Sequence, residues 1–139
     1  MYSQIILAKA KDSSDDGILE AWEVMDLDLK ADLVVLAACE TARGRVSGGE
    51  GMIGLSWAFF VAGCPATLAS QWNIDAASTT DLMVEFHRNL INGMSKAEAL
   101  RGAELKLLRK PRGAPLHPFY WAGFVVIGNP GPLPRSSVH

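Results

Sequence analysis

The pattern of apolar and polar positions along the chain predicts several β-strands. Continuous apolar runs of strand length occur at 31–39 and 65–72, and a shorter run at 3–9 predicts a strand or one half of a hairpin. A strand that is apolar on both faces is typical of a parallel sheet covered by helices on both sides. Residues 119–131 supply a last strand, which the Gly-Asn-Pro sequence at 128–130 ends.

Two helices are predicted between these strands. Residues 15–29 favour a short amphipathic helix, because apolar residues recur there at helical spacing. Its apolar face contains Ile18, Trp22, Met25 and Leu29. Residues 51–63 are apolar on every side and end at Gly63, shortly before Pro65, which is typical of a buried helix. The order strand, helix, strand over 32–72 therefore predicts a βαβ unit.

Two further helices carry their own start signals. Ser78 and Asp81 have the spacing of a capping box, in which each side chain accepts a hydrogen bond from the other residue's backbone N–H. Ser95 and Glu98 repeat this spacing, and the first of the two helices ends at Gly93. The predicted apolar faces contain Leu82, Phe86 and Leu90 in the first helix and Leu100, Ala103 and Leu107 in the second.

Length and composition favour one globular domain. A chain of 139 residues with 49% apolar and 20% charged positions can bury a core, and we expect a domain at 1–130 followed by a mobile tail at 131–139. The formal net charge of −2 gives no electrostatic reason to expect nucleic acid as a partner. No apolar run reaches the length of a membrane span, so no membrane partner is expected. Two cysteines make no disulfide framework, which favours a reducing, cytoplasmic location.

Cys39, at the end of the run 31–39, has two interpretations. Chemistry gathers where parallel strands end, and the glycine-rich stretch at 44–51 leads to a helix N-terminus that can lower the pKa of a thiol. These points favour a nucleophile. A free cysteine is also among the most buried residue types, and most buried cysteines are inert. The residues alone leave both interpretations open.

Four blocks of sequence, in order, resemble the CHAT domain, the caspase-like domain found beside tetratricopeptide repeats in bacterial proteins. They lie at 31–44, 49–75, 78–100 and 117–130. The resemblance implies a three-layer caspase-like α/β fold with a mainly parallel sheet whose N-terminal strands are missing. It also implies a cysteine peptidase that hydrolyses a protein or peptide substrate through a thioester. The nucleophile of the family ends the strand that corresponds to 31–39, so the resemblance assigns this role to Cys39.

The chain departs from the family in the base that activates the cysteine. CHAT domains carry a His-Gly pair upstream of the segment that resembles 3–9, and its glycine helps to form the oxyanion hole. A thiol needs such an imidazole to become a thiolate and to protonate the leaving amine. None of the three histidines replaces it: His87 lies on a predicted helix, His117 places the turn before the last strand, and His139 ends the tail. We therefore expect this chain to be catalytically inactive alone.

Trp72 and Asp75 match a family segment that lies by the specificity pocket of related peptidases. An acid there favours a basic side chain at the cleaved position. The family usually has two adjacent acids, whereas Ala76 follows Asp75 here, so a helix N-cap is an equal alternative for Asp75. Cys64 and His87 are too isolated for a zinc site, and the glycine-rich loop lacks a phosphate-binding motif, so no metal and no cofactor are expected.

Three interpretations of the whole protein stay open. The chain is a truncated part of a larger peptidase, a pseudo-peptidase that serves as a protein-interaction module, or one half of an enzyme completed by another chain or by strand pairing between copies. A sheet that lacks its upstream strands has an uncovered edge, which is a template for such pairing. Tetratricopeptide-repeat regions of a longer parent protein are expected as further partners.

Overall fold

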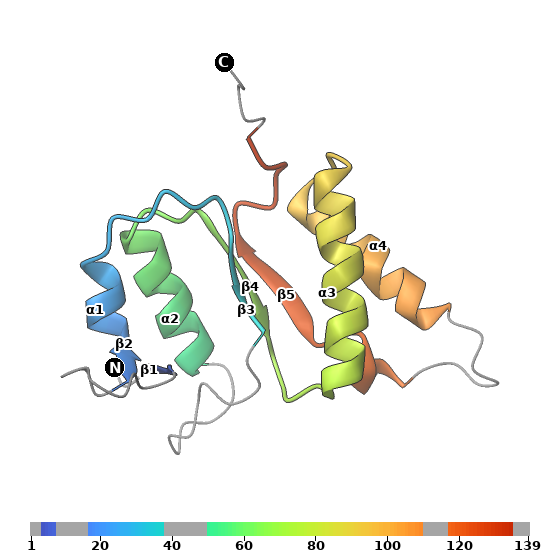
Figure 1. The fold of residues 1–139 in the computed structure, drawn as a ribbon, viewed down its shortest axis with the longest axis horizontal. Coiled ribbons are helices and arrows are strands. Elements are labelled where there is room, and N and C mark those ends of the chain that lie inside the picture. The colour runs from blue at the N-terminus through green and yellow to red at the C-terminus, as the bar shows by residue number, and fades with distance from the viewer. Residues whose placement is uncertain (1–3, 8–16, 38–49, 110–116, 135–139) are drawn as a thin grey trace.

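Helices cover both faces of a central β-sheet in a computed structural model that describes residues 4–7, 17–37, 50–109 and 117–134 (Figure 1). One layer contains α1 (Ala21–Met25) and α2 (Glu50–Val61), and the opposite layer contains α3 (Ala76–Ile91) and α4 (Lys96–Leu108). The sheet between them contains β3 (Val34–Leu36), β4 (Ala66–Ser70) and β5 (Phe124–Gly128). This is a mixed α/β arrangement in three layers, which the family resemblance implies.

The central sheet has one parallel and one antiparallel pair of strands, in the order β3-β4-β5. β3 and β4 run parallel with Leu36 beside Ala69, and α2 connects them, which confirms the βαβ unit. β5 runs antiparallel to β4, with Phe124 beside Ser70. The expectation of a mainly parallel sheet is therefore wrong for the described strands. Two successive helices, α3 and α4, return the chain to the end of the sheet where β4 stopped, so β5 starts there and runs back.

β3 lies at an edge of the described sheet, which changes its predicted burial. Its three residues are apolar but only half-buried, because β4 is its one described strand neighbour. Val35 packs toward the α3 and α4 side of the sheet, whereas Val34 and Leu36 pack toward the α1 and α2 side. The expected strand is confirmed, but its burial on both faces is incomplete.

The N-terminal segment forms a strand pair and a short helix. β1 (Gln4–Ile6) and β2 (Ile18–Glu20) pair antiparallel in a separate sheet, which confirms the strand predicted at 3–9. The helix predicted over 15–29 is wrong at both ends, since Ile18 pairs with Ile6 in the strands and α1 ends at Met25. Its predicted face is right only in part: Met25 and Leu29 pack, half-buried, against an apolar cluster, but Trp22 is exposed, and Ala21 and Val24 are the buried residues. Strand pairing has overridden the local helical spacing.

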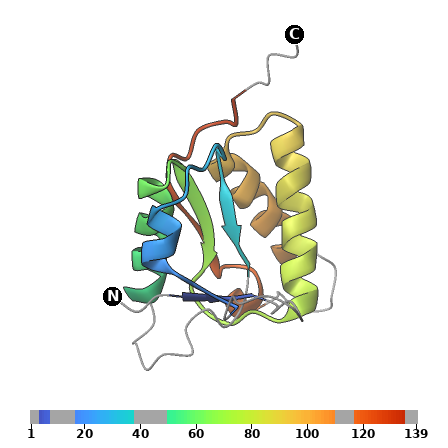
Figure 2. The same ribbon diagram turned by 60° about the vertical axis from the view of Figure 1, so that its left-hand side comes forward.

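The helices lie on either side of the sheet (Figure 2), and two apolar clusters attach them to it. The cluster under α3 and α4 also includes Leu68 of β4 and Phe124 of β5. It buries all six predicted face residues: Leu82, Phe86, Leu90, Leu100, Ala103 and Leu107. The burial of one such leucine or phenylalanine contributes about 1.5–3 kcal/mol, so this cluster is the main stabilising contact of its layer.

The cluster under α1 and α2 covers the opposite face of the sheet. It contains buried Leu55 and Phe59 of α2 together with Val24 of α1 and Cys64. The prediction of a helix at 51–63 is confirmed, but the expectation that it is buried all round is not. α2 belongs to an outer layer, so only the side that faces the sheet and α1 is covered by described residues (Figure 1).

The segment after β5 contacts the start of α4. The backbone N–H groups of Lys96 and Ala97 donate to the carbonyls of Gly131 and Pro130, at 3.2 Å each. The Lys96 ammonium also donates to Gly131 at 3.2 Å, and Leu133 packs against the α3 and α4 cluster. The first residues of the expected tail at 131–139 are therefore attached to the domain, while 135–139 lie outside the described residues.

Candidate functional site

The carboxyl ends of β3 and β4 lie at the same edge of the sheet because the two strands are parallel and in register. In an open α/β sheet this edge is where ligands and reactive groups gather. The last residue of β3, Leu36, precedes Cys39 by three positions, and Ala69, its partner in β4, precedes Trp72 by three. Cys39 itself lies outside the described residues, so its role as nucleophile stays a prediction.

Trp72 is held against a segment that is distant in sequence. Its indole N–H donates to the carbonyl of Phe119 at 2.9 Å, and the two rings stack with centroids 6.5 Å apart and an interplanar angle of 20°. The backbone N–H of Gln71 donates to Gly123 at 2.7 Å. These contacts fix the loop that follows β4 onto the turn that precedes β5.

An aromatic shelf is the result, formed by Trp72, Phe119 and Tyr120. Phe119 and Tyr120 meet edge to face, with centroids 5.4 Å apart and an interplanar angle of 89°. The three residues stay 37%, 43% and 38% exposed, respectively, so their rings are open to a ligand. Phe119 and Tyr120 were not among the predicted site residues, because only the tertiary contact with Trp72 brings them to this loop.

His117 sets the position of the shelf. It precedes a short 3₁₀ helix (Pro118–Tyr120), and its Nδ1 accepts a hydrogen bond from the Phe119 backbone N–H at 3.2 Å. An accepting Nδ1 carries no proton, so the hydrogen bond requires the neutral imidazole. This confirms the structural role that was predicted for His117.

Asp75 is the N-cap of α3. Its carboxylate accepts a hydrogen bond from the Ser78 backbone N–H at 3.0 Å, and the helix begins at Ala76. Hydrogen bonds from the Ser78 side chain and backbone hold the pKa of Asp75 below its ordinary value, so this exposed carboxylate is charged at neutral pH. The capping alternative for Asp75 is confirmed, and the cap predicted at Ser78 is three residues too late. A role for Asp75 in substrate binding stays a prediction.

Removing the Asp75 cap should destabilise the protein in a pH-dependent way. We expect Asp75→Ala to lower the free energy of unfolding by about 1 kcal/mol near neutral pH, whereas Asp75→Asn retains most of the cap. Because the pKa is lower in the folded state, the carboxylate stabilises the fold above the unfolded pKa of about 3.9, and this contribution is lost as pH falls through the folded pKa. Urea unfolding at pH 7 and pH 3 measures both effects. Equal losses for the two variants at pH 7 would contradict the capping role.

The other described histidine and cysteine have structural partners. Nδ1 of His87 lies 2.7 Å from the Met83 carbonyl on the preceding turn of α3, and the imidazole meets Phe86 edge to face. Cys64 is fully buried, with Sγ 3.2 Å from the Ala66 carbonyl oxygen. His139 lies outside the described residues. Both described histidines, His87 and His117, therefore make structural contacts, and neither is assigned as the base.

Glu104 is the described carboxyl group with a raised pKa. Its half-burial on α4 raises the pKa to about 7, because burial disfavours the charged form. Glu104 lies on α4, which packs against α3 and β5. Among the residues that the structure describes, no group of three or more potential ligands could hold a metal ion.

The class of protein follows from the family comparison. A family model for the CHAT domain matches residues 1–129, and this chain belongs to that family. It is 36% identical over 112 residues to tetratricopeptide repeat protein 28 of Mus musculus and to the protein of the same name in Homo sapiens. The match covers 81% of this chain but spans about 4% of the length of either relative.

No solved structure matches the chain. The helices that the structure describes are all too short or too polar to cross a membrane.

Proposed function

We propose that this chain is the nucleophile-bearing part of a caspase-like cysteine peptidase domain, with Cys39 as nucleophile. The observation that carries the proposal is the parallel register of β3 and β4. It brings the strand that leads to Cys39 to the same sheet edge as the strand that leads to Trp72. A nucleophile and a substrate-binding loop on neighbouring strand ends can hold one peptide between them.

The proposed reaction is acyl transfer from the peptide to the cysteine and then to water. The Cys39 thiolate attacks the carbonyl carbon of the scissile bond and forms a tetrahedral oxyanion. The C–N bond breaks as the amine takes a proton from a general acid, leaving a thioester. Water, deprotonated by the same group, hydrolyses the thioester and regenerates the thiol. Each half of the reaction therefore needs a base beside Cys39.

The loop after β4 would select the substrate. Asp75 offers an exposed, charged carboxylate, and Trp72 presents its ring three residues earlier, within the aromatic shelf. A carboxylate binds Arg or Lys through charge-assisted hydrogen bonds, and aromatic faces attract the same cations. We propose a peptide with a basic residue at the cleaved position as the substrate class.

The isolated chain is proposed to be inactive. Each described histidine makes a structural contact, and the His-Gly pair of the family is not among the 139 residues. β3 has one described strand neighbour and is apolar on both faces, so its other edge can receive a further strand. A strand from upstream sequence would bring the base to Cys39 at this edge. A pseudo-peptidase that binds proteins through the same edge is the alternative that this observation also favours.

The wider setting of the domain is also a proposal. The mammalian relatives are named for tetratricopeptide repeats, and this chain matches only a small part of them. We propose that repeats of this kind adjoin the domain in a longer protein and bind its partners, because stacked helical repeats form extended concave binding surfaces.

Thiol labelling across pH tests the proposal. We expect an iodoacetamide probe to modify Cys39 with half-maximal reaction at about pH 8.5, which is the pKa of an ordinary thiol. Buried Cys64 should stay unmodified in the folded protein. Cys39→Ala is the control for the site of labelling. Half-maximal labelling well below this pH would show that a base or a helix terminus already activates the thiol and would contradict inactivity.

Adding the upstream segment tests the peptidase assignment itself. A protein extended by the His-Gly segment of the family should label at lower pH and cleave peptides at Arg or Lys. Replacement of the added histidine by alanine should return labelling to the ordinary thiol range. An extended, folded protein that gains neither reactivity nor cleavage would favour the pseudo-peptidase.

A further inference from the structure

The aromatic shelf presents two rings that face in nearly the same direction. The planes of Trp72 and Phe119 differ by 20°, and their centroids lie 6.5 Å apart. Tyr120 meets Phe119 edge to face, so its ring fixes the orientation of Phe119 and does not extend the same surface. Because Trp72 and Phe119 are 37% and 43% exposed, one flat chemical group can contact both rings.

Gly123 holds the Trp72 ring in this position. Its carbonyl accepts a hydrogen bond from the Gln71 backbone N–H at 2.7 Å, and a Cβ added at Gly123 would lie 3.0 Å from Cε2 of Trp72. The same Cβ would lie 2.4 Å from Cδ1 of Ile74, which is almost fully buried. The Trp72 ring therefore packs against the Gly123 backbone, and a side chain at this position would displace it.

The two loops that form the shelf favour a cation as the bound group. Residues 66–75 and 117–131 contain no Lys or Arg, whereas Asp75 supplies a carboxylate. Three residues of chain separate Trp72 from Asp75, which is at most about 11 Å. The hydrogen bond from Ser78 uses one of the about four lone-pair positions of the carboxylate. A long basic side chain can therefore lie on the rings and still donate to Asp75.

We propose that the aromatic shelf selects arginine over lysine at the cleaved position, with Phe119 as a specificity-determining residue and Gly123 as a positioning residue. A guanidinium is planar, stacks on aromatic faces and donates to a carboxylate through a rigid fork. An ammonium is a compact, strongly hydrated charge without a plane. Two nearly parallel rings therefore distinguish the two cations. The inference deepens the proposed function and rests on it, because the shelf selects a substrate only if the domain binds one.

Binding of single amino acids tests the selection without any cleavage. The probes are the N-acetyl amides of arginine, lysine and citrulline, and citrulline is a planar, neutral counterpart of arginine. Each is added to the 139-residue chain at one ionic strength. NMR follows the indole N–H signal of Trp72, which its loss in Trp72→Phe identifies. Arginine should bind about two- to fivefold more tightly than lysine, the fold-change of one exposed cation–π contact, and citrulline more weakly than arginine.

Variants of Phe119 separate the ring from the loop that carries it. Phe119→Tyr keeps an aromatic face and should keep the preference for arginine, whereas Phe119→Leu should bind arginine and lysine equally. Phe119→Met gives a second variant without a ring should Phe119→Leu fail to fold. Gly123→Ala should shift the Trp72 indole signal before any probe is added and should also reduce the preference. A loss of stability alone would not change the ratio of the two affinities in the folded protein.

Trp22 is the matched control within the same molecule. It is exposed and its indole N–H donates to the Glu20 carboxylate, but none of the described rings stacks on it. Equal shifts at Trp22 and Trp72 would overturn the proposal, because the probes would then bind any exposed tryptophan beside a carboxylate. Equal affinities for arginine and lysine, equal affinities for arginine and citrulline, or an unchanged preference in Phe119→Leu would overturn it too.

These outcomes are separate from those of the proposed function, since none depends on the reactivity of Cys39. An extended protein that cleaves equally well after Arg and Lys would leave the peptidase assignment intact and overturn the selection of arginine. A shelf that prefers arginine in a protein that never cleaves would support the selection and contradict the peptidase assignment.

Discussion

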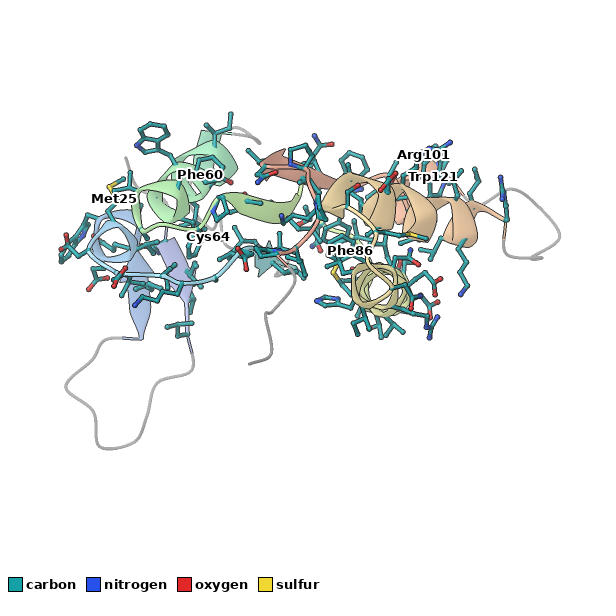
Figure 3. All side chains as sticks on the ribbon, turned by 90° about the horizontal axis from the view of Figure 1, so that it is seen from above. Met25, Phe60, Cys64, Phe86, Arg101 and Trp121 are labelled. Atoms are coloured by element: carbon teal, nitrogen blue, oxygen red, sulfur yellow. The ribbon has the colours of Figure 1, made fainter. Side chains whose placement is uncertain are left out.

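Replacement of Phe86 by alanine should lower the free energy of unfolding by about 3–5 kcal/mol, the range for a fully buried phenylalanine. Phe86 is completely buried and points from α3 toward α4 and the sheet (Figure 3). Its loss removes the transfer free energy of the ring and leaves a cavity in the cluster between α3, α4 and the sheet. Urea unfolding followed by circular dichroism measures the change.

Val84→Ala is the control for this experiment. Val84 lies on the same helix and is largely exposed, so its truncation should change stability by less than about 0.5 kcal/mol. A loss below about 1 kcal/mol for Phe86→Ala would show that α3 does not depend on this cluster. It would contradict the assignment of Phe86 to the core.

Gly128→Ala should also destabilise the protein strongly. Gly128 ends β5 with a φ of 93°, and an added Cβ would lie 2.4 Å from the Pro65 carbonyl oxygen and 2.9 Å from the Phe60 ring. The left-handed backbone alone costs about 1–2 kcal/mol for a residue with a side chain. The steric conflict adds about 1–3 kcal/mol, because backbone at Pro65 cannot rotate away as a side chain can. We expect a total loss of about 2–5 kcal/mol in urea unfolding.

Gly93→Ala separates the two contributions. Gly93 follows α3 with a φ of 86°, but an added Cβ would meet no atom within 4 Å. This variant should therefore show the backbone cost alone, about 1–2 kcal/mol. Equal losses for Gly93→Ala and Gly128→Ala would mean that the contact with Pro65 relaxes without cost.

Local patterns predicted the elements whose partners are near in sequence. The capping box of Ser95 and Glu98 is present as expected, with the Ser95 hydroxyl accepting from the Glu98 N–H at 3.2 Å. The buried face of α3 around Phe86 follows directly from its spacing. The start of α3 was misplaced because Asp75 and Ser78 are both good N-caps, and spacing alone does not choose between them.

Contacts between distant segments explain most of what the sequence did not predict. The short α1 results from the pairing of Ile18 with Ile6, and the aromatic shelf results from Trp72 meeting Phe119, 47 positions later. Neither contact leaves a periodic signal along the chain. For the candidate site, Trp72 and Asp75 were found through family resemblance, and Cys39 lies outside the described residues.

The central position of β4 has a consequence for the order in which the protein can fold. Leu68 of β4 pairs with Val35 through a connection that contains one helix, but its other partner, Val126, comes 58 residues later. A chain emerging from the ribosome can therefore complete the βαβ half first, while α3 and α4 still lack Phe124 and the last strand. During this interval one side of β4 and the apolar faces of two helices are uncovered. The newly made protein should then be most prone to aggregation and most dependent on chaperones.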